Sequence, residues 1–283
     1  MSAIWGDEAG EPAPVLTEVR EGVAVVTLNR PKRLNAWTPA MGSLYFSTLE
    51  RLALDSSVRS ILVTGQGRAF CAGIDLGGLA KLAASSGASP PPEPDLRPYW
   101  LPMSIGKPIV AAIRGPCFGV GLQQVLCCDI RFAADDVKLS APYSKRGLIG
   151  EVGMTWNLTR VIGAGAAMDL MLSGRTLESD EALEVGLVNR VIPGEKLFDE
   201  AFAYCRALAK ECSPWSMMMI KQQIYKDLMV DMHVAYSRSQ GMMTQALAGK
   251  AIVEGITAFR EKRSPAFAPL APEQATIDLG QET

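Results

Sequence analysis

The stretch KPIVAAIRGPCFGVGLQQVLCCDIRFAAD, residues 107–135, decides the fold. Its first part, KPIVAAIRG, is an apolar run that predicts a buried strand entering a glycine-rich turn. GVGLQQVLCCD, residues 119–129, predicts a helix, and IRFAADDVKLSAP, residues 130–142, predicts further short strands. Strand, turn and helix follow one another within this one stretch, which is typical of an α/β core.

Similar signals lie on both sides of this stretch. Residues 17–31 predict a hairpin that turns at Glu21 and Gly22, residues 39–55 predict a helix, and residues 58–65 predict a buried strand. Beyond Met154 nearly every segment predicts helix, except a strand or extended link in LVNRVIP. We therefore expect an α/β core followed by a helical region.

Composition limits the function. The chain has 283 residues, 48% apolar content and a net charge of −2, so it has no global field to attract nucleic acid or an anionic membrane. Six cysteines show no CxxC pair and are accompanied by a single histidine, His233, which predicts buried thiols in a cytoplasmic protein and no metal site. No segment predicts a signal peptide or a bilayer-spanning helix.

One segment interrupts the regular pattern. Residues 85–98, SSGASPPPEPDLRP, are rich in Ser, Gly and Pro and predict neither helix nor strand. Composition leaves two interpretations open, a mobile loop that closes over a ligand and a surface insertion without function.

Two glycine-containing turns follow buried strands, FCAGIDL at 70–76 and RGPCFGVGL at 114–122. Glycine allows close backbone approach, and the first N–H groups of a following helix have no helical partner. Two such turns side by side would aim two donors at one oxygen, the arrangement that stabilises an enolate or oxyanion. The alternative is a pair of tight connections in the core. The sequence contains no GxGxxG, Walker or GxSxG motif.

Glu151 stands between two glycines in GLIGEVGMT, residues 147–155. Its carboxylate is either a catalytic group or a residue that favours the start of the following helix through the macrodipole, worth about 0.3–1 kcal/mol. The apolar neighbours Leu148, Ile149, Val152 and Met154 would raise its pKa by desolvation.

Six segments, in order and spacing from about residue 17 to 267, carry a resemblance to one family: NRPKRLNAW (29–37), GRAFCAGIDL (67–76), residues 107–135, GLIGEVG (147–153), SGRTLESDEALEVGLVNRVIP (173–193) and AFREKRSPAF (258–267). They resemble the enoyl-CoA hydratase/isomerase, or crotonase, family. The resemblance implies a crotonase-like α/β spiral of ββα turns with a C-terminal helical trimerisation region, assembled as a homotrimer or a dimer of trimers.

With this resemblance we expect four parts: a flexible arm at 1–14, the spiral core at 15–210, a helical region at 211–270 and a tail at 271–283. The resemblance also implies an acyl-CoA thioester as substrate, with no cofactor beyond its coenzyme A moiety.

Site residues follow by position. The resemblance implies that the backbone N–H groups of Ile74 and Val120 hold the thioester oxygen. Contacts to coenzyme A would fall on the backbone at Ala72 and Gly73 and on two basic side chains. These are Arg33 and Lys262, the latter reaching a ligand of a neighbouring subunit. The alternative for both basic residues is solvated surface charge.

Departures from the family pattern bear on the reaction. Hydratases of the family use two glutamates, and their positions hold Gln123 and Tyr143 here. Glutamine cannot titrate and tyrosine, with a usual pKa of about 10, is a poor base. Glu151 stands where double-bond isomerases of the family place their carboxylate.

We therefore predict a Δ3,Δ2-enoyl-CoA isomerase, in fatty-acid or aromatic-acid degradation, in which Glu151 carries a proton from C2 to C4. The alternatives are an enoyl-CoA hydratase and a non-catalytic acyl-CoA binder. They differ by product, because a hydratase yields a 3-hydroxyacyl-CoA and a binder yields none.

Overall fold

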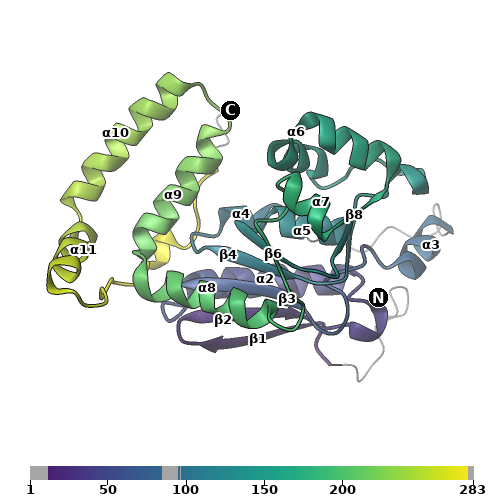
Figure 1. The fold of residues 1–283 in the computed structure, drawn as a ribbon, viewed down its shortest axis with the longest axis horizontal. Helices are drawn as coiled ribbons and strands as arrows, with labels where there is room; N and C mark the ends of the chain where they lie inside the picture. Colours follow the sequence, from purple (N-terminus) through teal and green to yellow (C-terminus); the bar gives the residue numbers. More distant parts are fainter. Residues whose placement is uncertain (1–11, 85–94, 96, 280–283) are drawn as a thin grey trace.

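The computed structural model describes residues 12–84, 95 and 97–279. Most of the expected N-terminal arm and of the Pro-rich segment at 85–98 lies outside these residues. The remainder forms a spiral core and a helical region that extends away from it (Figure 1). Within the described residues, no helix is both long and apolar enough to cross a bilayer.

The main sheet has six strands in the order β1-β2-β3-β4-β6-β9. Their bounds are Val15–Arg20, Val23–Leu28, Ser60–Gly65, Ile109–Ile113, Ile130–Ala134 and Arg190–Ile192. β1 and β2 are antiparallel and turn at Glu21 and Gly22, both with positive φ, which confirms the expected hairpin. All other neighbours are parallel.

A second sheet contains three short strands, β5 (Pro116–Phe118), β7 (Lys138–Ser140) and β8 (Thr176–Glu178). The chain passes from β4 to β5 and then to helix α5 (Val120–Leu126), and from β6 to β7 and then to helix α6 (Met154–Ser173). Each turn of the spiral therefore gives one strand to each sheet and then a helix.

The segment that follows β3 repeats this order, but with one β-bridge in place of a strand in the second sheet. Cys71 makes a single parallel bridge to Cys117 of β5, and the chain then enters helix α3 (Leu76–Ala84). This stacking of successive turns brings the two glycine-containing turns of the sequence next to each other.

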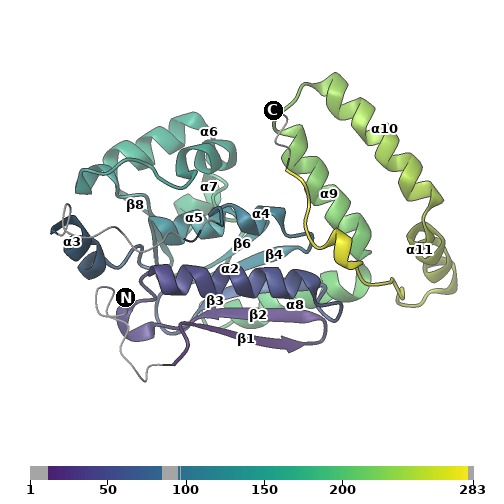
Figure 2. The ribbon, with the colours of Figure 1, turned by 180° about the vertical axis from the view of Figure 1, so that it is seen from behind.

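Two helices cover opposite faces of the main sheet. Alternate residues of β2 and β3 point to α2 (Pro39–Leu54) on one face and to α8 (Leu197–Glu211) on the other (Figures 1 and 2). Five of the six cysteines are buried in this structure. The remaining short helices are α4 (Leu101–Ser104), α7 (Ser179–Glu184) and the 3₁₀ helices Pro31–Arg33, Ser144–Arg146 and Pro272–Gln274.

The C-terminal region contains α9 (Pro214–Asp227), α10 (Met232–Ala248) and α11 (Lys250–Glu261), which project beyond the sheet (Figure 1). Exposed apolar side chains lie along these helices, among them Ile220, Ile224, Met232, Tyr236, Val253 and Phe259. Such a surface is typical of an assembly interface, and the trimer and the four-part division stay predictions.

Asp129 anchors this region to the core. Its carboxylate accepts hydrogen bonds from the Ile109 backbone N–H at 2.7 Å, Lys221 Nζ at 2.9 Å and the Tyr225 hydroxyl at 3.1 Å. The described part of the tail also returns to the core, where Ile277 N–H donates to the Ser104 carbonyl at 2.7 Å.

Candidate active site

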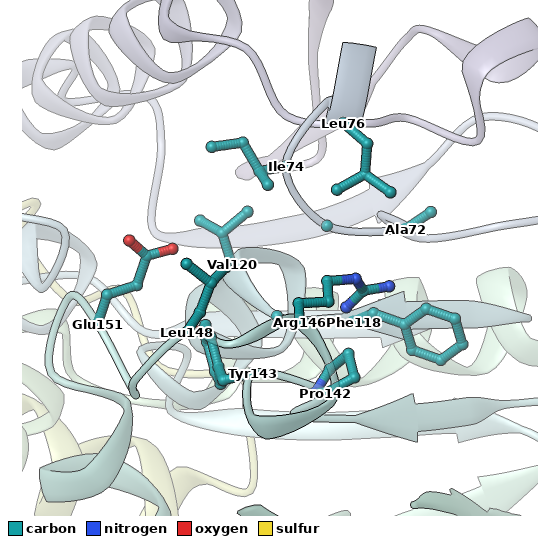
Figure 3. A pocket seen from close by; sticks show the side chains of 12 residues that line it. Ala72, Ile74, Leu76, Phe118, Val120, Pro142, Tyr143, Arg146, Leu148 and Glu151 are labelled. Atoms are coloured by element: carbon teal, nitrogen blue, oxygen red, sulfur yellow. The ribbon is translucent and has the colours of Figure 1, made fainter. Parts of the chain in front are cut away.

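A pocket opens where the turns before α3 and α5 meet the loop before α6 (Figure 3). Its empty volume, counting the open mouth, is about 430 Å³. The lining residues are Ala72, Gly73, Ile74, Leu76, Phe118, Gly119, Val120, Pro142, Tyr143, Arg146, Leu148 and Glu151. The structure thus brings together five of the residues chosen from the sequence, namely Ala72, Gly73, Ile74, Val120 and Glu151.

The first turn is held by Trp37, which pairs with Ile74 in a parallel bridge. Trp37 N–H donates to the Gly73 carbonyl at 2.8 Å, and Asp75 N–H donates to the Trp37 carbonyl at 2.9 Å. This pairing leaves the Ile74 N–H directed away from Trp37. Gly73 has φ +101°, and a Cβ there would lie 3.2 Å from the Phe118 carbonyl oxygen, so glycine suits the position.

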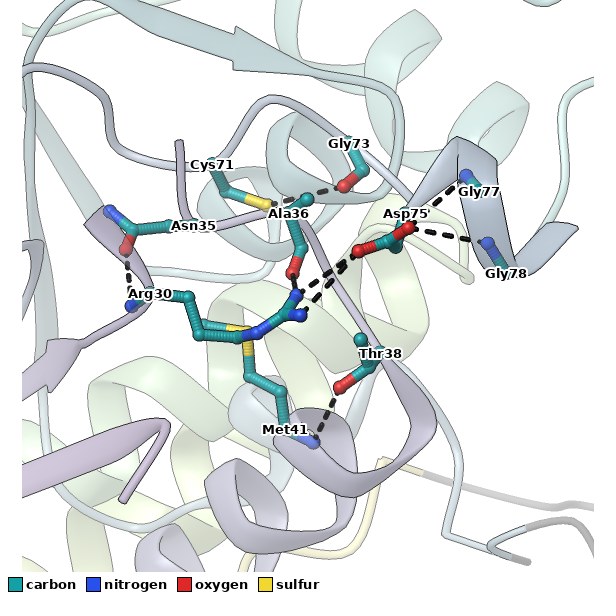
Figure 4. Close-up of polar contacts among 10 residues, drawn as sticks. All are labelled: Arg30, Asn35, Ala36, Thr38, Met41, Cys71, Gly73, Asp75, Gly77 and Gly78. Atoms are coloured by element: carbon teal, nitrogen blue, oxygen red, sulfur yellow. Dashed lines mark hydrogen bonds and ion pairs between the residues drawn. The ribbon is translucent and has the colours of Figure 1, made fainter. Parts of the chain in front are cut away.

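A buried ion pair supports the same turn (Figure 4). The Arg30 guanidinium lies 3.4 Å from the Asp75 carboxylate and also donates to the Ala36 carbonyl at 2.5 Å. The other carboxylate oxygen of Asp75 accepts the backbone N–H groups of Gly77 and Gly78, at 3.1 and 3.3 Å, and so caps the start of α3. Sequence reasoning missed this support for the first turn.

The second turn ends at Gly119, the N-cap of α5, which has φ +51° and ψ −119°. Its N–H donates to the Ser140 carbonyl of β7 at 3.0 Å. Val120 is then the first residue of the helix, where a backbone N–H has no helical acceptor. A Cβ on Gly121 would lie 2.5 Å from the Cys71 carbonyl oxygen, so glycine lets α5 pack directly on the first turn.

The two predicted donors therefore occupy adjoining turns. In the described part of the chain, neither the Ile74 N–H nor the Val120 N–H donates to another backbone group. Both residues line the pocket, so an oxygen bound there has two unused donors nearby. Their role as an oxyanion hole stays a prediction.

Glu151 lies in the loop between the 3₁₀ helix at 144–146 and α6 (Figure 3). The residue is solvent-exposed, yet its carboxylate faces the pocket, and desolvation by the surrounding protein raises its pKa above 4.5. No other described residue forms an ion pair or hydrogen bond with this carboxylate. The backbone holds the residue instead, because the Glu151 carbonyl accepts the Met154 N–H at 2.9 Å.

The neighbours of Glu151 differ in their surroundings. Leu148 lines the pocket and Met154 is fully buried. Ile149 is 85% exposed, so it does not help to exclude water from Glu151. Glu151 lies two residues before Gly153, the N-cap of α6, so its alternative role at a helix start also stays a prediction.

Tyr143 and Gln123 occupy the positions of the missing glutamates. Tyr143 lines the pocket, and burial, followed by the charge of Glu151, raises its pKa, so its phenol stays protonated. Gln123 is fully buried, and its Nε2 donates to the Val152 carbonyl at 2.8 Å. Neither side chain can take up a proton as a glutamate would.

Arg33 and Lys262 do not line the pocket. Arg33 is exposed beside Leu34, whose carbonyl accepts the Ala72 N–H at 3.0 Å, so it lies close to the first turn. Lys262 caps α11, far from α3 and α6 within one chain (Figures 1 and 2). Their contacts with coenzyme A stay predictions, and the structure adds Arg146, a basic lining residue that sequence reasoning missed.

His233 is exposed near the start of α10. Among the described residues, no group of His, Cys, Asp and Glu side chains is arranged to hold a metal ion.

The chain is similar to proteins of known family. A family model described as enoyl-CoA hydratase/isomerase matches residues 18–269. A 1,2-epoxyphenylacetyl-CoA isomerase of Escherichia coli is 34% identical over 89% of this chain and 97% of its own length. A protein of Mycobacterium tuberculosis named probable enoyl-CoA hydratase is 32% identical, with 89% and 97% covered. An enoyl-CoA hydratase structure from Bacillus anthracis aligns with a TM-score of 0.81 at 27% identity, covering 90% of this chain and 99% of the other.

Proposed function

The chain belongs to the enoyl-CoA hydratase/isomerase, or crotonase, family, and from this premise we propose that it is a Δ3,Δ2-enoyl-CoA isomerase with Glu151 as its proton carrier. The observation that carries the proposal is that Glu151 supplies the single carboxylate among the described residues that line the pocket. Glu151 lies with the Ile74 and Val120 donors, whereas positions 123 and 143 hold residues that do not act as carboxylates.

The reaction needs one base and one site for negative charge. Glu151 removes a proton from C2 of a 3-enoyl thioester, and the electrons delocalise through the double bond onto the thioester oxygen. The N–H groups of Ile74 and Val120 stabilise that dienolate oxygen. The protonated Glu151 then returns the proton to C4, which places the double bond between C2 and C3.

Glu151 must be ionised to begin this reaction, so activity depends on its raised pKa. We expect kcat/KM to be constant near neutral pH and to fall as the pH decreases through a value above 4.5, the ordinary pKa of a glutamate. Measuring kcat/KM for a 3-enoyl-CoA between about pH 4 and 9 tests this decrease at acidic pH. A decrease in kcat/KM that begins only below pH 4.5, or a kcat/KM that increases at acidic pH, would contradict the assignment of Glu151 as the base.

A hydratase is the second candidate, because relatives such as the mycobacterial protein carry that name. Water addition needs an activated water and a proton for C2, and Glu151 alone would have to serve both. The chemistry of Gln123 and Tyr143 therefore favours the isomerase.

The product distinguishes the candidates. We would supply matched 3-enoyl-CoA and 2-enoyl-CoA thioesters and separate the products by mass. Conversion of the 3-enoyl form into its 2-enoyl isomer supports the proposal. A product heavier by one water, formed at a comparable rate, supports the hydratase, and binding of both thioesters without turnover supports an acyl-CoA binder.

A further inference from the structure

We propose that Gln123 is a positioning residue that aims the Glu151 carboxylate, a proposal that rests on the isomerase function above. The two side chains come from different elements, α5 and the loop before α6. A side-chain hydrogen bond joins these elements beside the pocket. Its donor is Gln123 Nε2 and its acceptor is the carbonyl of Val152, the residue after Glu151.

The donor end of the bond is buried, whereas Val152 at the acceptor end is partly exposed. Gln123 is 0% exposed, and its Nε2 is 2.8 Å from the Val152 oxygen. A Cβ added to Gly153 would lie only 3.5 Å from the same nitrogen, so the loop packs directly on the amide. Losing the donor would leave the Val152 carbonyl without its side-chain partner.

The loop needs this restraint because its backbone is strained. Val152 has φ +50°, a left-handed conformation that is unfavourable for a β-branched residue. Strain of this kind persists only where surrounding contacts hold it, and it is concentrated at functional sites. The Gln123 amide donates to the carbonyl of the strained residue itself, and that residue directly follows Glu151 in the chain.

The same helix carries one of the oxyanion donors. Val120 begins α5 and Gln123 lies one turn later, so the bond to Val152 connects the base to the Val120 N–H through one rigid turn of helix. The distance between the proton carrier and the thioester oxygen is therefore set by Gln123. Displacing a catalytic group by about 1 Å can reduce turnover about a hundredfold.

An amide suits this task and a carboxylate does not. Glutamine donates through Nε2, whereas an ionised glutamate offers only acceptors and would repel both the Val152 carbonyl and the Glu151 charge. The Gln123 Oε1 atom accepts no hydrogen bond from the described residues, so donation is the function that the amide performs here.

The test uses Gln123→Met, which keeps the volume and removes the donor, with Gln124→Met as the matched control. Gln124 is the next residue of α5, is also buried, and directs its Nε2 to the Tyr99 carbonyl at 3.4 Å. We expect Gln123→Met to reduce kcat for a 3-enoyl-CoA by about 10–100-fold with KM nearly unchanged. Gln124→Met should stay within about twofold of the wild type.

A pH series of Gln123→Glu adds a readout that a purely structural role would not change. When the carboxyl group introduced at position 123 is protonated, it regains one O–H donor for the Val152 carbonyl. At pH values where Glu151 stays ionised in both proteins, the ratio of the variant's kcat to that of the wild type should therefore rise as the pH falls. A ratio independent of pH would count against the proposal.

Several results would overturn the inference. A folded Gln123→Met that retains the kcat of the wild type, or an equal loss in Gln124→Met, shows that the bond does not aim Glu151. If the wild type itself forms no isomer, the proposed function fails. Crystal structures of wild type and Gln123→Met then decide: Val152 relaxing to negative φ in the variant supports the positioning role, and Val152 unchanged contradicts it.

Discussion

Replacing Glu151 by glutamine lowers kcat for conversion of a 3-enoyl-CoA into its 2-enoyl isomer by about 10²–10⁴-fold, the expected loss of a general base. Glutamine has nearly the same shape but can neither remove the C2 proton nor deliver one to C4. The Glu151 side chain forms no ion pair or hydrogen bond with other described residues, so its replacement should change the stability of the fold little. Binding of the thioester, measured by calorimetry, should also be retained.

Glu184→Gln is the matched control. Glu184 is an exposed glutamate at the end of α7, outside the pocket lining, and its replacement should leave kcat unchanged. If Glu151→Gln isomerises the substrate at the wild-type rate, Glu151 is not the proton carrier. If the variant loses thioester binding in parallel with kcat, the carboxylate acts in binding instead.

The sequence predicts most of the sheet because each strand carries its own signal. β4 is apolar and buried throughout, and β3 carries an apolar, buried run at residues 61–63, which a single segment reveals. Local patterns miss the strands β5 and β8, because the first lies within a predicted turn and the second within the predicted helical half. Each has three residues and exists because β7 lies between them, a partnership that no local pattern contains.

The site shows the same division. Residue types and spacing indicate two glycine turns and one isolated glutamate, and the family resemblance joins them. Local patterns are compatible with either a catalytic role or a helix-start role for Glu151. Its position in the pocket lining favours the catalytic role. The supporting contacts are beyond the reach of such patterns, because Arg30 and Asp75 are 45 residues apart and Gln123 and Val152 are 29 apart. Such pairs depend on how the turns of the spiral stack.

Replacing Val120 by proline tests the oxyanion donor in a way the fold can accept. Val120 is the first residue of α5, where proline is tolerated because its missing N–H has no helical acceptor. The preceding Gly119 accommodates the restriction that proline places on its neighbour. The hydrogen bond to the dienolate oxygen is then removed, and we expect kcat to fall by about 10²–10³-fold.

Val120→Ala supplies the comparison, since the Val120 side chain is buried and proline also changes its packing. Alanine loses that packing but keeps the N–H, so its kcat should remain well above that of the proline variant. Charge on the thioester oxygen is greater in the dienolate than in the bound substrate, so KM should change much less than kcat in Val120→Pro. Equal kcat values for the two variants would show that the Val120 N–H does not stabilise the reacting oxygen, and the Ile74 N–H would have to act without it.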